Sequence, residues 1–200
     1  MSQNLSQSPH PQMQTHNESN VMHHIRVENA IYYITTNVYA RLALFTRPTT
    51  IIPIIDSLNF YRYKCDFLII GFVIMPDHLH LLIWPQGPDD LGNTMRDFKK
   101  FTATRLVRQA QVENNREWLE AFERAGTETG RSHDKVWQDD YWDKLVYSPK
   151  VLKQKLNYIH RNPVRAGLVS SPESYPYSSY RNYVCGDESL IQIDREWLSW

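Results

Sequence analysis

The stretch KCDFLIIGFVIMPDHLHLLIWP, at residues 64–85, constrains the fold of this 200-residue chain more than any other part of it. It holds two apolar runs rich in β-branched and aromatic residues, and the dipeptide Pro76-Asp77 between them is a turn signal. Runs of this kind joined by a tight turn are typical of an antiparallel hairpin. Because few polar side chains interrupt the two runs, we expect a hairpin of two buried strands.

The hairpin lies within an alternating succession of expected strands and helices. Dense β-branched and aromatic residues predict a strand at 30–36, and apolar residues at helical spacing predict helices at 51–58 and 91–108. A charged segment at 111–133 is expected to be peripheral, with a helix to about residue 125 and then a loop. The strings VWQDDYW and LVY predict a last strand or two, and a final helix is expected from Pro149 to Asn162, where Pro163 disfavours continuation.

The order β-α-β-β-α-β-α predicts an α+β fold, with a ferredoxin-like antiparallel sheet, helices on one face and an additional C-terminal helix. A hydrophobic content of 42% suits a single domain with its own core. The expected division is a disordered polar leader at 1–24, one domain at 25–183 with a peripheral acidic insertion at 110–134, and a tail at 184–200.

Several classes of protein are disfavoured. The longest apolar run, residues 67–75, is much shorter than the roughly 20 residues of a membrane-spanning helix, and no signal sequence opens the chain. The two cysteines, Cys65 and Cys185, belong to no CxxC pair and cannot form a secreted disulfide framework. We therefore expect a soluble cytoplasmic protein, associated with the nucleoid if it binds DNA.

Charge is segregated along the chain, although 22 basic and 22 acidic residues balance formally. Residues 144–165 contain no Asp or Glu, a second basic cluster lies at 96–108, and acidic residues gather at 113–143. Most charge runs are simply solvated faces. If the protein binds DNA, these two clusters supply the candidate phosphate contacts, which are Arg96, Lys99, Lys100, Arg105, Lys150, Lys153, Lys155, Arg161 and Arg165.

The sequence His78-Leu79-His80 lies in the second strand of the expected hairpin. Because strand side chains alternate, both imidazoles should point to one face and Leu79 to the other. Two neutral imidazoles on one face form half of a metal site. A lone pair of this kind also occurs by chance, as two satisfied or half-exposed histidines on a sheet, so a third group is needed to support a metal site.

The final helix offers such a group. Leu152, Leu156 and Ile159 form its core-facing stripe, whereas Tyr158 and Asn162 lie away from that stripe and one turn apart on a shared face. Each alone has a plainer interpretation, Tyr158 as a surface aromatic and Asn162 as a helix terminator. Together with the histidines they match a nucleophilic mechanism. A divalent cation on two imidazoles and an amide oxygen would polarise a phosphate, and Tyr158 would attack it.

Five strings then give a resemblance to a known family, spanning roughly residues 25–183: GFVIMPDHLHLLIWP, FKKFTATRL, VWQDDYW, LNYIHRNPVRAGLV and PESYPYSSYRNY. They resemble the REP-associated tyrosine transposases, relatives of the insertion-sequence-200-like single-tyrosine transposases with a His-hydrophobic-His (HUH) motif. The resemblance implies that His78, His80 and Asn162 bind Mg²⁺ or Mn²⁺ and that Tyr158 is the nucleophile. It also implies the ferredoxin-like fold.

The implied function is recognition of a palindromic DNA hairpin and cleavage and rejoining of the adjoining single strand, through a 5′-phosphotyrosine, by a monomer or homodimer. Tyr175, Tyr177 and Tyr180 could stack on unpaired bases or serve local packing. Three alternatives stay open: a non-catalytic, domesticated hairpin-binding protein, a small-substrate hydrolase that uses water, and a replication or mobilisation nickase. A formal net charge of zero and the acidic segment are departures that the family does not explain.

Overall fold

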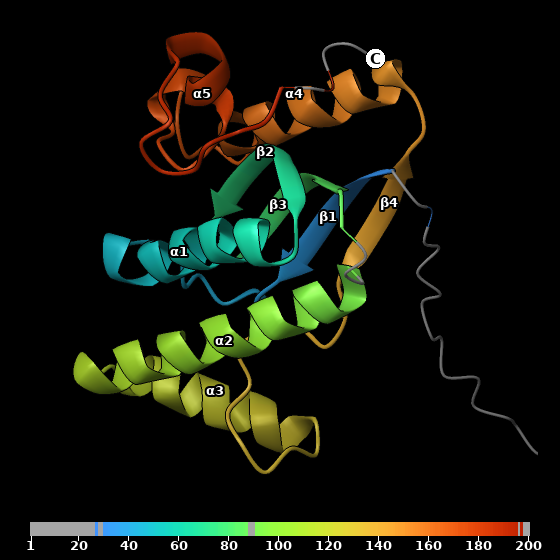
Figure 1. Ribbon diagram of the computed structural model, residues 1–200. Helices are drawn as coiled ribbons and strands as arrows, with labels where there is room; N and C mark the ends of the chain where they lie inside the picture. Colours follow the sequence, from blue (N-terminus) through green and yellow to red (C-terminus); the bar gives the residue numbers. More distant parts are fainter. Residues whose placement is uncertain (1–26, 28–29, 88–90, 196, 198–200) are drawn as a thin grey trace, which may run out of the picture.

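The computed structural model describes residues 27, 30–87, 91–195 and 197, so the expected leader at 1–24 lies outside the described residues. The centre of the described domain is an antiparallel sheet with the strand order β2-β3-β1-β4 (Figure 1). The strands are β1 (Ile31–Asn37), β2 (Phe67–Met75), β3 (His78–Pro85) and β4 (Trp142–Val146). The helices are α1 (Pro48–Lys64), α2 (Leu91–Val112), α3 (Arg116–Glu128), α4 (Pro149–Arg165) and α5 (Tyr180–Cys185). The α+β class and the ferredoxin-like strand order are confirmed.

The predicted hairpin is present as β2 and β3. Met75 pairs with His78 across the turn, and the ladder continues to Phe67 opposite Pro85. All nine residues of β2 except Leu68 are buried, as the near-continuous apolar runs predict. The hairpin places both histidines at the start of β3, close to the turn.

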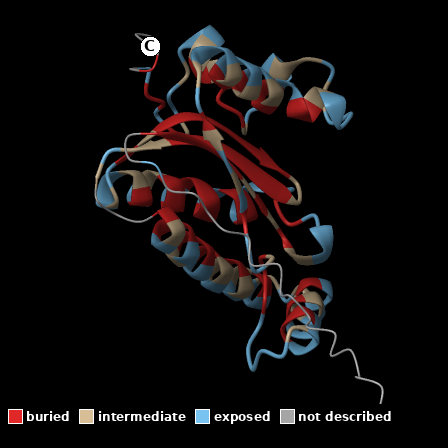
Figure 2. Cartoon of the chain, turned by 90° about the vertical axis from the view of Figure 1, so that its right-hand side faces the viewer, coloured by how far each residue is buried: buried red, intermediate tan, exposed pale blue. Residues whose placement is uncertain are grey.

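The sheet separates two hydrophobic cores, because successive side chains of each strand point to opposite faces. Tyr32 and Ile34 of β1 pack into the larger core with α1 and α2, whereas Ile31 and Tyr33 pack into a second core with α4. Strands β1, β2 and β3 are accordingly largely buried between helical layers (Figure 2), whereas β4 is partly exposed. Helices α1 and α2 therefore share one face, as predicted, and the additional C-terminal helix α4 covers the other.

Helix α4 differs from its prediction at the C-terminal end. We expected Pro163 to stop the helix at Asn162, but α4 continues to Arg165 with Pro163 inside it. The last turn is closed instead by hydrogen bonds from the Ala166 and Leu168 amides to the Asn162 and Pro163 carbonyls, both 2.9 Å. A proline so near the end of a helix costs only one intrahelical bond, which this closure offsets.

The charged segment forms a helix, as expected, and packs on the side of α2 away from the sheet (Figure 1). The Asn115 side chain caps α3 by accepting a hydrogen bond from the Trp118 amide at 3.2 Å. Trp118 and Phe122 are buried against the larger core. Residues 131–141 then return along α2 to the start of β4.

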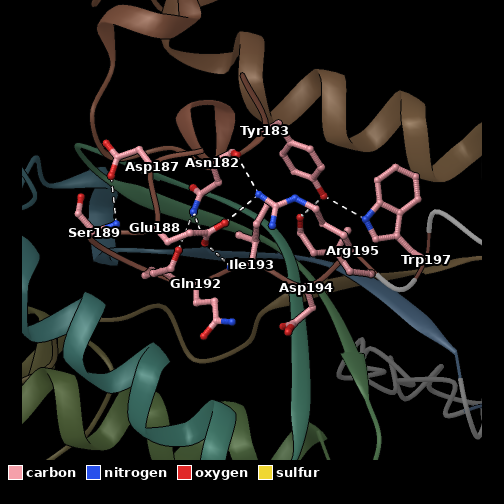
Figure 3. A network of polar contacts seen from close by, with 12 residues as sticks. Asn182, Tyr183, Asp187, Glu188, Ser189, Gln192, Ile193, Asp194, Arg195 and Trp197 are labelled. Atoms are coloured by element: carbon pink, nitrogen blue, oxygen red, sulfur yellow. Dashed lines mark hydrogen bonds and ion pairs between the residues drawn. The ribbon is translucent and has the colours of Figure 1, made fainter. Parts of the chain in front are cut away.

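The C-terminal residues do not form a detached tail. Ile191 and Ile193 are buried in the larger core, and Asp194 pairs with Arg62 of α1. Figure 3 shows the polar contacts that fix this segment, in which Glu188 accepts hydrogen bonds from Asn182 at 2.8 Å and from the Ile193 amide at 2.9 Å. The domain therefore extends past the boundary expected at residue 183.

Within the part of the chain that the structure describes, no helix has the length and apolar character needed to cross a membrane.

Candidate active site

The two histidines of β3 lie on the sheet face that α4 covers. Leu79 and Leu81 point to the opposite core, as alternation along the strand predicts. The Nε2 atoms of His78 and His80 are 3.2 Å apart, and their rings meet edge to face with centroids 4.7 Å apart. Both imidazoles therefore direct the same nitrogen into one small volume.

His78 is oriented from behind by a carboxylate. Asp77 places Oδ1 2.5 Å from His78 Nδ1, and its other oxygen pairs with Arg41 Nε at 2.7 Å. Because a carboxylate only accepts, the Nδ1 of His78 must carry the proton, although the Arg41 guanidinium also approaches it at 3.3 Å. This assignment leaves the lone pair on His78 Nε2, the atom that faces His80.

His80 is held by two hydroxyl groups on the neighbouring strand β1. Tyr33 Oη and Thr35 Oγ1 lie 2.9 Å and 2.8 Å from His80 Nδ1. A hydroxyl can donate or accept, so these two residues fit either tautomer of His80. Hydrogen bonds to the outer nitrogen are the usual way in which proteins orient a metal-binding histidine.

Burial keeps both imidazoles neutral. It lowers the pKa of His78, although the Asp77 carboxylate opposes that shift. It lowers the pKa of His80 to about 3, helped by the neighbouring His78, Arg41 and Lys155. Burial likewise raises the pKa of the Tyr33 hydroxyl, so this group is a neutral hydrogen-bonding partner. Neutral imidazoles are the form that binds a metal ion.

Helix α4 brings Tyr158 to this pair. The Tyr158 ring meets His80 edge to face with centroids 5.5 Å apart, and it meets Tyr33 at 6.2 Å. Asn162 lies one turn further along α4 and is buried. Its side chain makes no hydrogen bond within the described residues, so its amide oxygen is available to a ligand. The structure thus brings Tyr158 and the histidines together, while no measured contact joins Asn162 to them.

The donor set fits a divalent cation. His78 and His80 supply two converging imidazole nitrogens with outer hydrogen bonds in place. No cluster of three or more His, Cys, Asp or Glu side chains exists among the described residues. A cation here would therefore be held by the two histidines, with further oxygen ligands from Asn162, water or a phosphate.

Two cations of the C-terminal basic block lie beside Tyr158. Lys155 Nζ is 6.0 Å from the centroid of the Tyr158 ring, and the Arg165 guanidinium carbon is 5.4 Å from it. Lys150, Lys153 and Arg161 are exposed on the same helix. All five candidate contacts of this block are therefore on α4, around the candidate nucleophile.

The candidate contacts on α2 divide into two groups. Arg96 and Lys100 are exposed and line a cavity of about 980 Å³ between α2 and residues 131–141, and Arg105 pairs with Asp56 at 3.1 Å. Lys99 is different, because it is buried and its Nζ donates to the carbonyls of residues 138, 139 and 140 at 2.5, 2.8 and 3.2 Å. Lys99 was expected to contact a DNA phosphate, but its ammonium group is buried and instead fastens the loop before β4.

Sequence reasoning missed the residues that orient the histidines. Asp77 was interpreted only as part of the turn, although its position beside His78 was a usable signal. Tyr33 and Thr35 occupy alternate positions of β1, but their partner could not be known without the β1–β3 register, which places Thr35 opposite His80. Tyr175, for which stacking on bases and local packing were both open, is buried and donates to the Ile74 carbonyl at 2.7 Å.

No family model matches the chain, but two curated proteins and a solved structure are similar to it. A protein of Haemophilus influenzae, provisionally named a REP-associated tyrosine transposase, is 29% identical over 129 residues, covering 62% of this chain and 66% of the relative. The REP-associated tyrosine transposase of Escherichia coli is 25% identical over 130 residues, covering 64% and 62%. The matches thus span slightly less than two thirds of each relative's length.

A solved structure described as a REP-associated tyrosine transposase bound to a REP hairpin superimposes with a TM-score of 0.61 at 21% identity, over 86% of this chain and 88% of that one. At this identity the superposition establishes the fold. The chain is thus similar in sequence to two REP-associated tyrosine transposases and shares the α+β fold of the solved one.

Proposed function

We propose that this protein is a metal-dependent, single-tyrosine DNA transposase that cleaves and rejoins a single strand next to a DNA hairpin. The observation that carries this proposal is the meeting of Tyr158 with the histidine pair, at 5.5 Å between the Tyr158 and His80 rings. A phenol beside two converging imidazoles matches an arrangement of nucleophile and metal ligands. The names of the relatives and of the solved neighbour supply the class of substrate.

In the proposed reaction the Tyr158 oxygen attacks a DNA phosphorus atom. The bond between that phosphorus and the 3′-oxygen of the preceding nucleotide breaks, the phenol loses its proton, and the departing oxygen gains one as a 3′-hydroxyl. The new phosphotyrosine ester conserves the bond for rejoining. A Mg²⁺ or Mn²⁺ ion held by His78, His80 and Asn162 would supply charge stabilisation at the phosphate.

The protein's own residues have distinct tasks in this scheme. Asp77 and the hydroxyls of Tyr33 and Thr35 hold the imidazoles in the orientation described above. Lys155 and Arg165 place positive charge next to the Tyr158 ring, where the DNA strand would pass. Exposed cations on α4 and α2 would contact the hairpin backbone. If about four to six of them touch phosphates, the log-log salt slope of binding should be roughly −3 to −5.

The decisive test is a covalent adduct between the protein and DNA. Incubation with a hairpin oligonucleotide that has a single-stranded flank, in Mn²⁺, should give a denaturant-resistant species that carries the 5′ end of the cut strand. Tyr158→Phe should bind the same DNA and form no adduct, because it removes only the phenol oxygen. Tyr147→Phe, at an exposed tyrosine just after β4, is the matched control and should form the adduct normally.

The result also separates the alternatives. His78→Ala and His80→Ala should abolish cutting and spare hairpin affinity, and chelator should act in the same way. Cutting without an adduct would indicate a hydrolase that uses water. Hairpin binding without cutting under any metal condition would indicate a non-catalytic binding protein, and the proposed activity would be refuted.

A further inference from the structure

An exposed tryptophan stands at the edge of the candidate site. Trp142 opens β4 and is 40% exposed, whereas Tyr33 on the adjacent strand and the same face is 3% exposed. Trp142 pairs in register with Thr35, the residue that contacts His80. Its ring meets Tyr33 edge to face, with centroids 5.9 Å apart. Trp142 is thus two strand pairings from His80, a candidate metal ligand, with much of its side chain open to solvent.

Two lysine ammonium groups lie within cation–π distance of this ring. Lys144 Nζ lies 5.7 Å and Lys155 Nζ 5.8 Å from the Trp142 centroid. Lys155 also lies 4.5 Å from the Tyr33 ring, which connects Trp142 to the Tyr158 ring 6.2 Å further on. In the described part of the chain, neither ammonium group forms an ion pair with a carboxylate. Their charge is therefore not neutralised by the protein itself.

An exposed aromatic ring next to cations that no carboxylate neutralises is an arrangement that binds single-stranded nucleic acid. The ring face accepts an unpaired base of any sequence, and the ammonium groups accept the adjoining phosphates. A base within a duplex cannot offer its face to such a ring, because its neighbours in the stack cover it. The occupant must therefore be an unpaired nucleotide, and it would lie close to Tyr158, because the Trp142 and Tyr158 rings both contact the Tyr33 ring.

We propose that Trp142 is a stacking platform for the unpaired base next to the scissile phosphate, with Lys144 and Lys155 holding the phosphates of that nucleotide. This inference rests on the proposed function and identifies which part of the substrate the site recognises. It makes Trp142 a residue that selects the single-stranded flank, separate from the α2 cations and the other α4 cations that would contact the hairpin itself. A merely structural Trp142 would only shield the edge of Tyr33.

Binding should be measured in chelator, so that no cutting occurs, with two probes: a blunt DNA hairpin and the same hairpin with a single-stranded flank that carries 2-aminopurine. Trp142→Leu should weaken binding of the flanked probe about 5- to 100-fold, which corresponds to the stacking of one base, and should leave the blunt probe unchanged. Trp142→Phe should keep most of the affinity, because it keeps an aromatic face. Quenching of 2-aminopurine should occur with the wild type and be lost with Trp142→Leu.

Two further variants separate stacking from charge and from folding. Lys155→Gln should reduce the magnitude of the salt slope by about 0.7, the contribution of one single-strand phosphate contact, whereas Trp142→Leu should leave that slope unchanged. Tyr63→Leu, at an exposed aromatic on α1 across the sheet, is the control and should bind both probes normally.

If Trp142→Leu weakens both probes equally, or neither, the stacking role is refuted while the flank preference and the Tyr158 adduct of the wild type still support the transposase. If the wild type itself shows no preference for the flanked probe, the proposed function falls together with this inference.

Discussion

Acidification should destabilise this protein because it buries histidines in their neutral form. Burial lowers the pKa of His80 to about 3 and that of His160 to about 4, from an ordinary value of 6.5. At a pH between the folded and the ordinary pKa of each histidine, the unfolded chain binds more protons than the folded chain. Stability is therefore complete above the unfolded pKa and falls as the pH drops below it, until the folded pKa is reached.

The size of this loss of stability follows from the range of pH between the folded and unfolded pKa values. Each pH unit inside it is worth about 1.4 kcal/mol per histidine, so lowering the pH from about 6.5 to about 5 should cost roughly 2 kcal/mol at each site. His160 can be tested alone, because its Nε2 lies 2.9 Å from Ser179 Oγ on the side of α4 away from Tyr158. His160→Gln keeps a donor for Ser179 and removes the ionisable ring.

Urea unfolding followed by circular dichroism, in chelator and at about pH 7 and about pH 5, provides the measurement. His80 and His160 together should contribute about 4 kcal/mol to the loss of the wild type between these conditions, and His160→Gln should lose about 2 kcal/mol less than the wild type. The readout is the difference between pH values, so a constant loss of stability from the substitution does not affect it. An unchanged pH dependence in His160→Gln would refute the claim that burial excludes the proton at this site.

Three further predictions test the packing, the loop anchor and the orientation of the histidines. Gly71→Ala should lower the free energy of unfolding by about 1–3 kcal/mol in the same urea assay, because the new Cβ would lie 2.7 Å from Leu156 Cδ1 of α4. Lys100→Gln should reduce the magnitude of the salt slope of hairpin binding by about 0.9. Lys99→Gln should leave that slope unchanged and reduce stability instead. Equal slopes for the two variants would contradict the assignment of Lys99 as a loop anchor and Lys100 as a phosphate contact. Asp77→Asn should weaken Mn²⁺ binding about 10- to 100-fold by calorimetry, because the carboxylate that fixes the adjacent imidazole is lost, and unaltered affinity would count against that role.

Features that depend on local periodicity could be predicted from the sequence. The apolar runs around Pro76 and Asp77 defined the hairpin, and strand alternation placed His78 and His80 on one face. Helical spacing separated Tyr158 from the core stripe of α4. Each of these inferences uses only neighbours within one element, where chain geometry fixes which side chains share a face.

Features that depend on long-range packing could not be predicted. The burial of Lys99 requires a loop about 40 residues further along the chain to turn its carbonyls toward α2. The contact of Tyr33 with His80 joins residues 47 positions apart and follows from the β1–β3 register. The end of α4 was placed too early at Asn162, because the preference of the residue before Pro163 for a non-helical conformation is offset by hydrogen bonds that close the helix beyond it. Tertiary context decided all three.

The segment at residues 177–194 affects the solubility of the folded chain, because it covers an edge of the sheet. β2 is a long, apolar strand at one edge of the sheet, and this segment bonds to it along much of its length, through Tyr177 to Ile74, Ser179 to Phe72 and Asp194 to Ile69. An uncovered edge of that kind is a template for pairing with another chain. Loss of these residues would expose it, and the resulting defect would be aggregation through the strand edge, even though the histidines and Tyr158 lie elsewhere.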